Sequence, residues 1–327
     1  MTTYKGIKGF NIQTVSSDPP APFIGQVWYN STSNTVKYFT NVPSSWATGG
    51  NLGTGRYNLG GVGTQTAGLA FGGGPSVPNV GMLTEEYNGS AWTGGGNLTT
   101  SRESLAGAGT QTAGLAFGGR TAPPRQSLNA TEEYNGSSWT NGGNLGTARY
   151  FLAGAGTQTA GLAFGGASPE TSTKNATEEY GGTSWTAGGN LGTARSALAG
   201  AGTQTAGLAI GGSPGGSNET NASEEYNGTA WTGGGTMNTA IRYLAGCGLQ
   251  TAALAFGGLG SGIPTQTEEY DGSSWTTGAT LNIARLRLGG AGTQTAGLGF
   301  GGQAPPDKNA TEEYTGGGPA TFTVGSS

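Results

Sequence analysis

One eleven-residue phrase, GTQTAGLAFGG, recurs in near-identical form along the chain. Its copies begin at Gly63, Gly109, Gly156, Gly202, Gly248 and Gly292. The apolar residue at the ninth position of each copy repeats at intervals of 46, 47, 46, 46 and 44 residues. Such self-similarity is the signature of a repeat architecture, in which each unit buries its apolar surface against its neighbours. We therefore expect a set of equivalent units rather than unrelated domains.

Each unit has the pattern of four short strands. In residues 147–185, RYFLAGAG and TAGLAFGG are two β-like runs separated by the polar pair TQ, which predicts a hairpin. ATEEY is a third run and the segment around Trp185 a fourth; in equivalent units these two are joined by NG, a strong turn signal. No segment shows a sustained helical period. Because seven Trp, twelve Tyr and ten Phe recur regularly, the 68 glycines indicate a folded all-β chain rather than disorder.

The side chains of these runs favour radial stacking of sheets. LAGAG has almost no side-chain volume, as expected for inner strands crowded around an axis. In TAGLAFGG, Leu162 and Phe164 share one face of the strand, and Gly161 and Ala163 share the other. A sheet with one bulky and one small face packs well on its neighbour, and sheets stacked around an axis form a β-propeller.

Four motif elements in each unit resemble the kelch-repeat propellers. That family has a double glycine after the second strand, a Tyr on the third, a Trp on the fourth and an Arg before the next first strand. The matching positions are Gly165, Gly166, Tyr180, Trp185 and Arg195, and NLGTAR is similar to the family's connecting segment. The resemblance covers residues 35–324 and implies a kelch-type β-propeller.

The motif sets predict six blades. Double glycines after the second strand, blade tryptophans, connecting arginines and EEY each occur six times, whereas a seven-bladed ring would need another double-glycine hairpin. The sets are offset, because Trp46 and Arg56 precede the first double glycine and the last EEY has no Trp after it. We therefore expect the N-terminal strand with Trp46 to complete the last blade, whose other strands come from residues 288–315. The predicted propeller is residues 35–327, after an N-terminal extension of residues 1–34.

The paired glutamates and the connecting arginines are the charged residues of the repeat. The first glutamate shares a strand face with the Tyr, and we expect it to pair with an arginine, since a guanidinium can bond a carboxylate twice. The second is expected to face solvent. The predicted structural ring comprises Glu85, Glu132, Glu178, Glu224, Glu268, Glu312, Arg56, Arg102, Arg149, Arg195, Arg242 and Arg285. Cation binding and glycosidase-type catalysis are the alternatives, but adjacent glutamates on a strand diverge.

Composition argues against several function classes. A net charge of −4 with 14 scattered Lys and Arg provides no basic patch for nucleic acid. Without His and with a single Cys, the chain is not expected to hold a metal or cofactor, and no catalytic residue is predicted. Cys247 is interpreted as a small buried apolar residue, with a reactive thiol as the alternative. The absence of an 18-residue apolar run and of a signal-peptide core predicts no membrane insertion and no secretion.

The segment between the double glycine and EEY differs most among the repeats. These segments join equivalent strands, so all six should project from one face of the disc. Variable loops on a near-constant scaffold suit a binding surface, and their polar residues suit sugars; drift of unconstrained loops is the alternative. The candidate contact residues are Arg120, Arg125, Gln126, Ser172, Lys174, Asn218, Thr220, Gln266, Asp307 and Lys308.

The N-terminal segment PPAPFIGQVWYNSTSNTVKYFT departs from the repeat and predicts two strands, at residues 25–29 and 35–39. It resembles a short module of bacteriophage tail-fibre and other virion proteins. The matching positions are Trp28, Tyr29, Lys37 and Tyr38. The GTQTAGLAFGG and TEEYNGSSW arrays also resemble those of predicted structural proteins of aquatic phages. A hairpin that only caps the propeller is the alternative.

These resemblances imply a non-enzymatic virion protein, such as a tail fibre or tail-associated appendage, made in the host cytoplasm. Its N-terminal segment would bind other virion proteins, and its loop face a host-surface glycan or receptor. One alternative is a decoration or assembly protein whose loops bind only neighbouring subunits. Another is a carbohydrate-active propeller enzyme, which would need carboxylates converging in one pocket. A homo-oligomer is compatible with the sequence, although no heptad seam predicts a coiled-coil stalk.

Overall fold

The computed structural model describes residues 12–74, 80–121, 125–168, 173–261, 265–303 and 309–324. The chain divides into two compact units: unit 1 is Met1–Ser44 with Gly317–Ser327, and unit 2 is Ser45–Gly316. Residue 35, the predicted start of the repeat domain, is the first residue of a strand in unit 1. Among the described residues the helical structure is one short 3-10 turn, η1 (Val80–Met82), and no helix there is long and apolar enough to cross a membrane.

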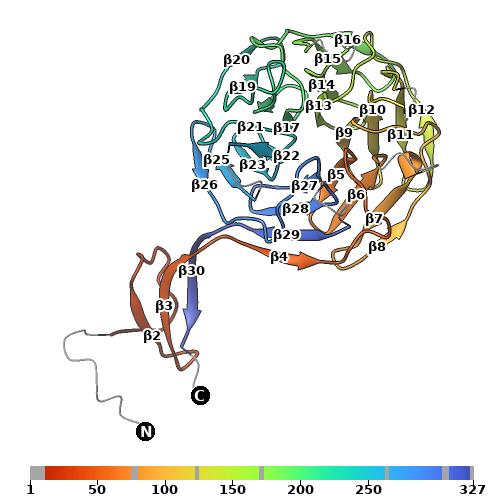
Figure 1. Ribbon diagram of the computed structural model, residues 1–327. Coiled ribbons are helices and arrows are strands. Elements are labelled where there is room, and N and C mark those ends of the chain that lie inside the picture. The colour runs from red at the N-terminus through yellow and green to blue at the C-terminus, as the bar shows by residue number, and fades with distance from the viewer. Residues whose placement is uncertain are drawn as a thin grey trace. The chain divides into compact units, whose positions relative to one another are not determined.

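Unit 2 is a propeller-like all-β structure built from four-stranded antiparallel sheets. Figure 1 shows these sheets set around a common centre. Three of the sheets, in chain order, contain β5 (Gly60–Thr64), β6 (Ala67–Phe71), β7 (Thr84–Tyr87), β8 (Trp92–Gly94), β9 (Ala106–Gly109), β10 (Gly114–Phe117), β11 (Thr131–Tyr134), β12 (Trp139–Asn141), β13 (Ala153–Gly156), β14 (Gly161–Phe164), β15 (Thr177–Tyr180) and β16 (Trp185–Ala187).

Three further sheets of the same kind follow, and a two-stranded pair lies beside one of them. The strands of the sheets are β17 (Ala199–Gly202), β18 (Gly207–Ile210), β19 (Ser223–Tyr226), β20 (Trp231–Gly233), β22 (Ala245–Leu249), β23 (Ala252–Phe256), β25 (Thr267–Tyr270), β26 (Trp275–Thr277), β27 (Gly289–Gly292), β28 (Ala296–Phe300), β29 (Thr311–Thr315) and β4 (Ser45–Gly49). The pair is β21 (Ile241–Arg242) with β24 (Leu259–Gly260).

The last of these sheets joins the two ends of unit 2. Its strand order is β27-β28-β29-β4, so the strand that begins unit 2 completes the sheet that ends it. Trp46 on β4 is opposite Tyr314 on β29, and its ring centroid lies 5.0 Å from those of both Tyr314 and Phe256. β4 is the strand that the motif offset assigned to this place.

The inner strands of the sheets lie close together around the centre. Each inner strand contacts the next, and the last contacts the first, in a closed cycle of β5, β9, β13, β17, β22 and β27. A Cβ atom on Gly154 of β13 would lie only 2.4 Å from the carbonyl oxygen of Gly107 on β9. The two backbones are so close that a side chain does not fit at this position. This explains why the LAGAG sequence of the inner strands consists mainly of small residues.

Tyrosine and glutamate join each sheet to its neighbour. The Tyr that ends the third strand donates its hydroxyl hydrogen bond to the second glutamate of EEY in the adjacent sheet, as Tyr87 does to Glu313 at 2.6 Å. The same bond recurs in all six sheets. The second glutamate was expected to face solvent. It is instead half-buried, because its strand face is turned toward the neighbouring sheet.

Two further side chains bond across the same interfaces. The indole of Trp139 donates to the hydroxyl of Thr84 at 2.9 Å, and equivalent Trp bonds occur in every sheet. Gln158 of the TQT turn donates to the carbonyl oxygens of Gly114 and Tyr134, at 3.0 and 2.7 Å. The repeated phrase therefore encodes the joints between sheets as well as the strands themselves.

Unit 1 is a sheet of order β1-β2-β3-β30, formed by β1 (Gln13–Val15), β2 (Val27–Asn30), β3 (Thr35–Val42) and β30 (Gly318–Thr323). The two predicted strands correspond to β2 and β3. The carboxylate of Asp18 accepts bonds from the Lys37 ammonium at 2.7 Å, the Asn30 amide at 2.8 Å and the Trp28 indole at 3.1 Å. These donors, Lys37 first, lower the pKa of Asp18 to about 2. Asp18 thus ties the segment before the hairpin to both of its strands.

Candidate functional site

A buried ion pair occupies the same place in five of the six repeats. The arginine before the inner strand reaches the first glutamate of EEY on the third strand. The pairs are Arg56–Glu85, Arg102–Glu132, Arg149–Glu178, Arg195–Glu224 and Arg285–Glu312. Each of these arginines is at most 1% exposed. Charges are buried this deeply only where they are paired and hydrogen-bonded.

Arg149 shows what each buried arginine holds together. Its Nη2 lies 2.8 Å from Oε1 of Glu178. Its Nη1 donates to the carbonyl oxygens of Gly165 at 2.9 Å and Ala176 at 2.7 Å, which are the two ends of a variable loop. Burial lowers the pKa of Arg149, and the charge of Glu178 opposes this shift. The ion pairs therefore fix the stems of the loops on the scaffold.

The repeat that contains Arg242 differs, because its arginine is displaced by one residue. Counted back from the leucine that precedes the inner strand, Ile241 takes the place that Arg149 has in its own repeat, and Ile241 is buried. Arg242 lies one position outside the ring and pairs with Glu219, with 3.0 Å between Nε and Oε1. The prediction that Arg242 belongs to the structural ring is therefore wrong. It relied on residue type, whereas the distance in sequence from the following leucine determines which residue takes the buried position.

Glu268, the expected partner of Arg242, is held in another way. Its carboxylate accepts bonds from the backbone N–H groups of Asn238 at 2.8 Å and Thr239 at 3.1 Å. The Asn238 amide donates to it as well, at 3.0 Å. Backbone and amide donors thus compensate a buried carboxylate that has no arginine beside it.

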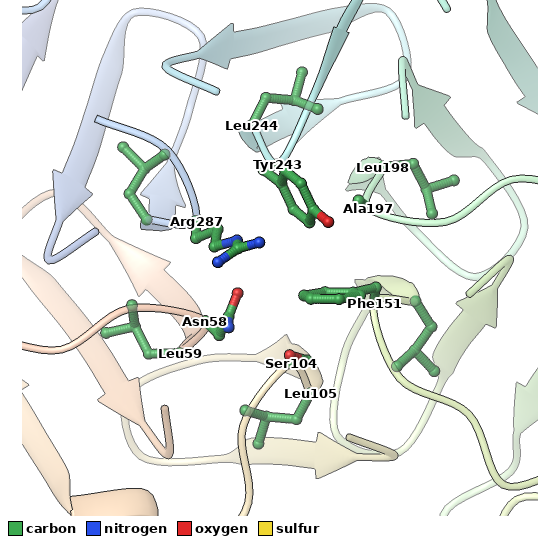
Figure 2. A pocket seen from close by; sticks show the side chains of 12 residues that line it. Asn58, Leu59, Ser104, Leu105, Phe151, Ala197, Leu198, Tyr243, Leu244 and Arg287 are labelled. Atoms are coloured by element: carbon green, nitrogen blue, oxygen red, sulfur yellow. The ribbon is translucent and has the colours of Figure 1, made fainter. Parts of the chain in front are cut away.

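In each repeat, two residues lie between the buried arginine position and the following leucine. The second of the two lines the opening at one end of the central axis. The second of each pair has a left-handed backbone, with φ between 53° and 58°. These residues are Asn58, Ser104, Phe151, Ala197, Tyr243 and Arg287. The N–H of each donates to the C=O of the one before it at 2.8 Å, and Asn58 donates to Arg287, which closes the circle. We call these six residues the axial ring; Figure 2 shows their side chains around the opening.

The six residues of the axial ring share one backbone conformation, but their side chains differ from repeat to repeat. A left-handed conformation is uncommon for a Phe or Tyr and costs about 1–3 kcal/mol. The closed circle of hydrogen bonds holds the backbone there with six different side chains, so these positions vary without a change in the scaffold. The signal is in the sequence, as RYNL, RESL, RYFL, RSAL, IRYL and RLRL. The variation covers only two residues in each repeat, so it stands out less in the sequence than that of the longer loops.

A pocket of about 400 Å³ opens beside the axial ring, among the variable loops. Tyr150 and Phe151 line it from one repeat, and Tyr243 and Arg287 from two others. The repeat between them contributes Ser196, whose pair Ser196-Ala197 is the smallest of the six. The space that Tyr150 and Phe151 fill in their own repeat is therefore empty in the next one, and this difference creates the pocket.

Two guanidinium groups flank a run of aromatic rings along the pocket wall. Arg120 lies over the rings of Tyr150 and Phe151, at 4.9 and 5.3 Å from their centroids. The ring of Phe151 contacts that of Tyr243 edge-on at 5.2 Å, and Arg287 lies 4.4 Å from the Tyr243 centroid. Cation–π and edge-to-face contacts of this kind hold the side chains in a defined arrangement before any ligand arrives.

Of the ten loop residues predicted as contacts, Arg120 and Arg125 line this pocket. Gln266 donates to the hydroxyl of Thr239 at 3.1 Å, and the backbone of Thr220 bonds Gly212 at 2.9 Å, so both have contacts within the fold. Gln126 and Asn218 are exposed and Lys174 is half-buried, and none of the three lines the pocket. Ser172, Asp307 and Lys308 lie outside the described residues.

The pocket offers groups for hydrogen bonding and ion pairing. Its charged side chains are arginines, and its hydroxyl groups belong to Ser, Thr and Tyr. In the described parts of the chain no cluster of three or more His, Cys, Asp or Glu is placed to hold a metal ion. Cys247 lies elsewhere, on β22; burial raises the pKa of its thiol to about 12, which leaves it protonated and supports the buried apolar interpretation. No protein-family model matches the chain, and no curated protein matches its sequence.

Proposed function

We propose that unit 2 is a six-bladed kelch-type β-propeller, closed by β4, and that the chain is a non-enzymatic bacteriophage virion protein that binds a host-surface glycan. The blade count is supported by the six like sheets and by the closed cycle of inner strands. The kelch assignment is supported by the double glycines, tryptophans and buried arginines at equivalent places in the sheets.

The observation that carries the binding role is the axial ring. Six different side chains stand on one repeated backbone conformation, next to a pocket of a size typical for small-molecule sites. A constant scaffold with varied side chains at its mouth is the arrangement expected of a recognition surface. Aromatic faces beside hydroxyl and guanidinium donors suit a sugar, which has both apolar C–H faces and hydroxyl groups.

Unit 1 is the proposed attachment side, with a neighbouring virion subunit as its partner. Of the eight exposed large hydrophobic residues in the described chain, seven belong to unit 1. They are Ile12, Phe23, Ile24, Val27, Tyr38, Phe322 and Val324. Exposed apolar side chains concentrated in one unit favour a protein contact there.

A glycan array tests the binding role. The informative variant is Ser196→Tyr, because Tyr57 and Tyr150 occupy the equivalent position in other repeats and the backbone accepts them. The added ring fills the pocket, so we expect wild-type protein to bind a restricted set of glycans and the variant to lose them. Leu286→Tyr is the matched control at the equivalent position outside the pocket, and should bind as the wild type does. Wild-type protein that binds no glycan would contradict the proposal.

A further inference from the structure

The arginines of the chain are distributed in a way that selects the pocket. The sequence has nine arginines, of which five form the buried ion pairs. Of the other four, Arg120, Arg125 and Arg287 line the pocket. The fourth, Arg242, lies over the ring of Tyr243 at 5.3 Å and donates to the carbonyl oxygen of Gly216, and both of these residues line the pocket. All four arginines outside the buried ion pairs therefore lie at or beside this pocket, although the net charge of the chain is −4.

The carboxylates near the pocket neutralise only half of these charges. Arg120 pairs with Glu103 and Arg242 with Glu219, each at 3.0 Å. Within the described residues, no carboxylate lies within salt-bridge distance of Arg125 or Arg287. Two guanidinium groups thus face the pocket without a counter-charge from the described chain, which favours an anionic ligand.

Arg287 is the better positioned of the two. It belongs to the axial ring, so its backbone is fixed by the circle of hydrogen bonds. Its Nη1 donates to Oε1 of Gln303 at 2.8 Å, and its guanidinium packs on the ring of Tyr243. A guanidinium held at both points loses little freedom when it binds an anion, and its planar fork matches a carboxylate.

The remaining lining suits the body of a sugar. Tyr150, Phe151 and Tyr243 offer aromatic surface on two sides of the hollow. Ser196 and Thr173 bring hydroxyl groups that can exchange hydrogen bonds with those of a sugar. A peptide chain would need an extended groove or a free sheet edge, whereas this site is a single hollow beside the axis.

We propose that the pocket binds a carboxylated sugar unit, such as a uronic or sialic acid residue of a glycan, with its carboxylate on Arg287 and Arg125 and its ring against the aromatic side chains. This inference rests on the proposed glycan-binding function and specifies the ligand class.

Calorimetric titration with matched oligosaccharides tests the ligand class. The probes are oligosaccharides that end in glucuronic, galacturonic or N-acetylneuraminic acid, together with the carboxamide of each, which has nearly the same shape without the charge. We expect at least one acid to bind 10-fold or more tightly than its carboxamide. Arg287→Asn should abolish this preference; Asn occupies the equivalent position 58, so the axial ring is retained. Lys174→Asn removes the same charge from a loop residue that does not line the pocket, and should leave the preference intact.

Several results would overturn the inference. Equal affinity for acids and carboxamides, or a preference that survives Arg287→Asn, would reject an acidic sugar while leaving glycan binding in place. Binding of an acidic peptide but of no oligosaccharide, abolished by Ser196→Tyr, would assign the pocket to a protein ligand. If no glycan of any kind binds, the proposed function itself fails, and the array of neutral and acidic glycans separates that result from the first.

Discussion

Arg195 shows how one side chain bonds both the third strand of a sheet and the two ends of a variable loop. Its Nη1 donates to the carbonyl oxygens of Gly211 at 3.1 Å and Ala222 at 2.7 Å, and its Nη2 lies 3.0 Å from Glu224. The side chain is fully buried. Removing it would leave a buried carboxylate and a loop stem without their shared donor.

We therefore predict that Arg195→Ala lowers the free energy of unfolding by about 3–5 kcal/mol, the range found when one partner of a buried ion pair is removed. Arg242→Ala is the comparison, because the side chains of Arg242 and Glu219 remain 15% and 23% exposed, so a smaller loss than for Arg195→Ala is expected. Denaturant unfolding of both variants measures the difference. Equal losses would mean that the buried ion pairs do not support the fold.

Cys247 gives a second prediction at the residue scale. Its side chain is nearly inaccessible, and burial raises its pKa to about 12, so the thiolate that reacts with disulfide reagents is absent at neutral pH. We predict no labelling by a thiol reagent in the folded protein and complete labelling after denaturation. Rapid labelling of the native protein would show that the inner strand β22 opens readily.

At the scale of the elements, the interface between sheets is the repeated unit of stability. A Tyr–Glu bond, a Trp–Thr or Trp–Ser bond and a pair of Gln bonds recur at each junction. The sheets are held by the same three contacts each time, so the effect of removing one contact can be compared between junctions. Tyr87 is informative because burial, followed by its bond to Glu313, raises its pKa to about 12.

Tyr87→Phe should show a pH-dependent loss of stability. Because the pKa of Tyr87 in the folded state is above the ordinary value near 10, the folded state binds the proton more tightly than the unfolded state. Its contribution is therefore complete below pH 10 and declines as the pH rises toward 12. We predict that the variant is less stable than the wild type by about 1–3 kcal/mol at pH 8. This difference should shrink above pH 10, and a difference independent of pH would contradict the assignment.

Local patterns predicted the strands well, and partners distant in sequence were harder to predict. The hairpin signals place the strands within each sheet because turn chemistry and alternation are local properties. The long-range pairing of β4 with β29 is the exception, since it followed from counting the repeated motifs. The second glutamate was misjudged because its partner tyrosine lies on another sheet, 45 to 48 residues away in most junctions. Arg242 was misplaced because residue type does not reveal a shift of one position. The pocket was missed because it arises where Ser196-Ala197 leaves a space, which depends on neighbouring repeats.

At the scale of the whole molecule, the closure of unit 2 depends on β4, which has no turn connecting it to β29. Trp46 and Trp139 form matched interactions: each packs on a Phe and a Tyr at about 5 Å, and each indole bonds a Thr hydroxyl. Either change to Ala should cost about 3–5 kcal/mol. Trp46→Ala should also loosen its strand more than Trp139→Ala does, because β12 is joined to β11 by a short turn, whereas β4 is tethered to β29 only through the pairing of β3 with β30. Hydrogen exchange of β4 in Trp46→Ala and of β12 in Trp139→Ala checks this. An equal loss of protection in the two strands would contradict closure by β4.

The central claim is that the face with the axial ring is a free binding surface on a virion. Electron cryo-microscopy of intact particles from the source of this chain tests it most directly. We predict that unit 2 is found on an outward appendage with the axial ring facing solvent, and that unit 1 contacts a neighbouring subunit. Particles in which the variable loops are buried against other subunits would contradict the receptor-binding role and identify an assembly protein. Particles that lack the chain altogether would contradict the virion assignment.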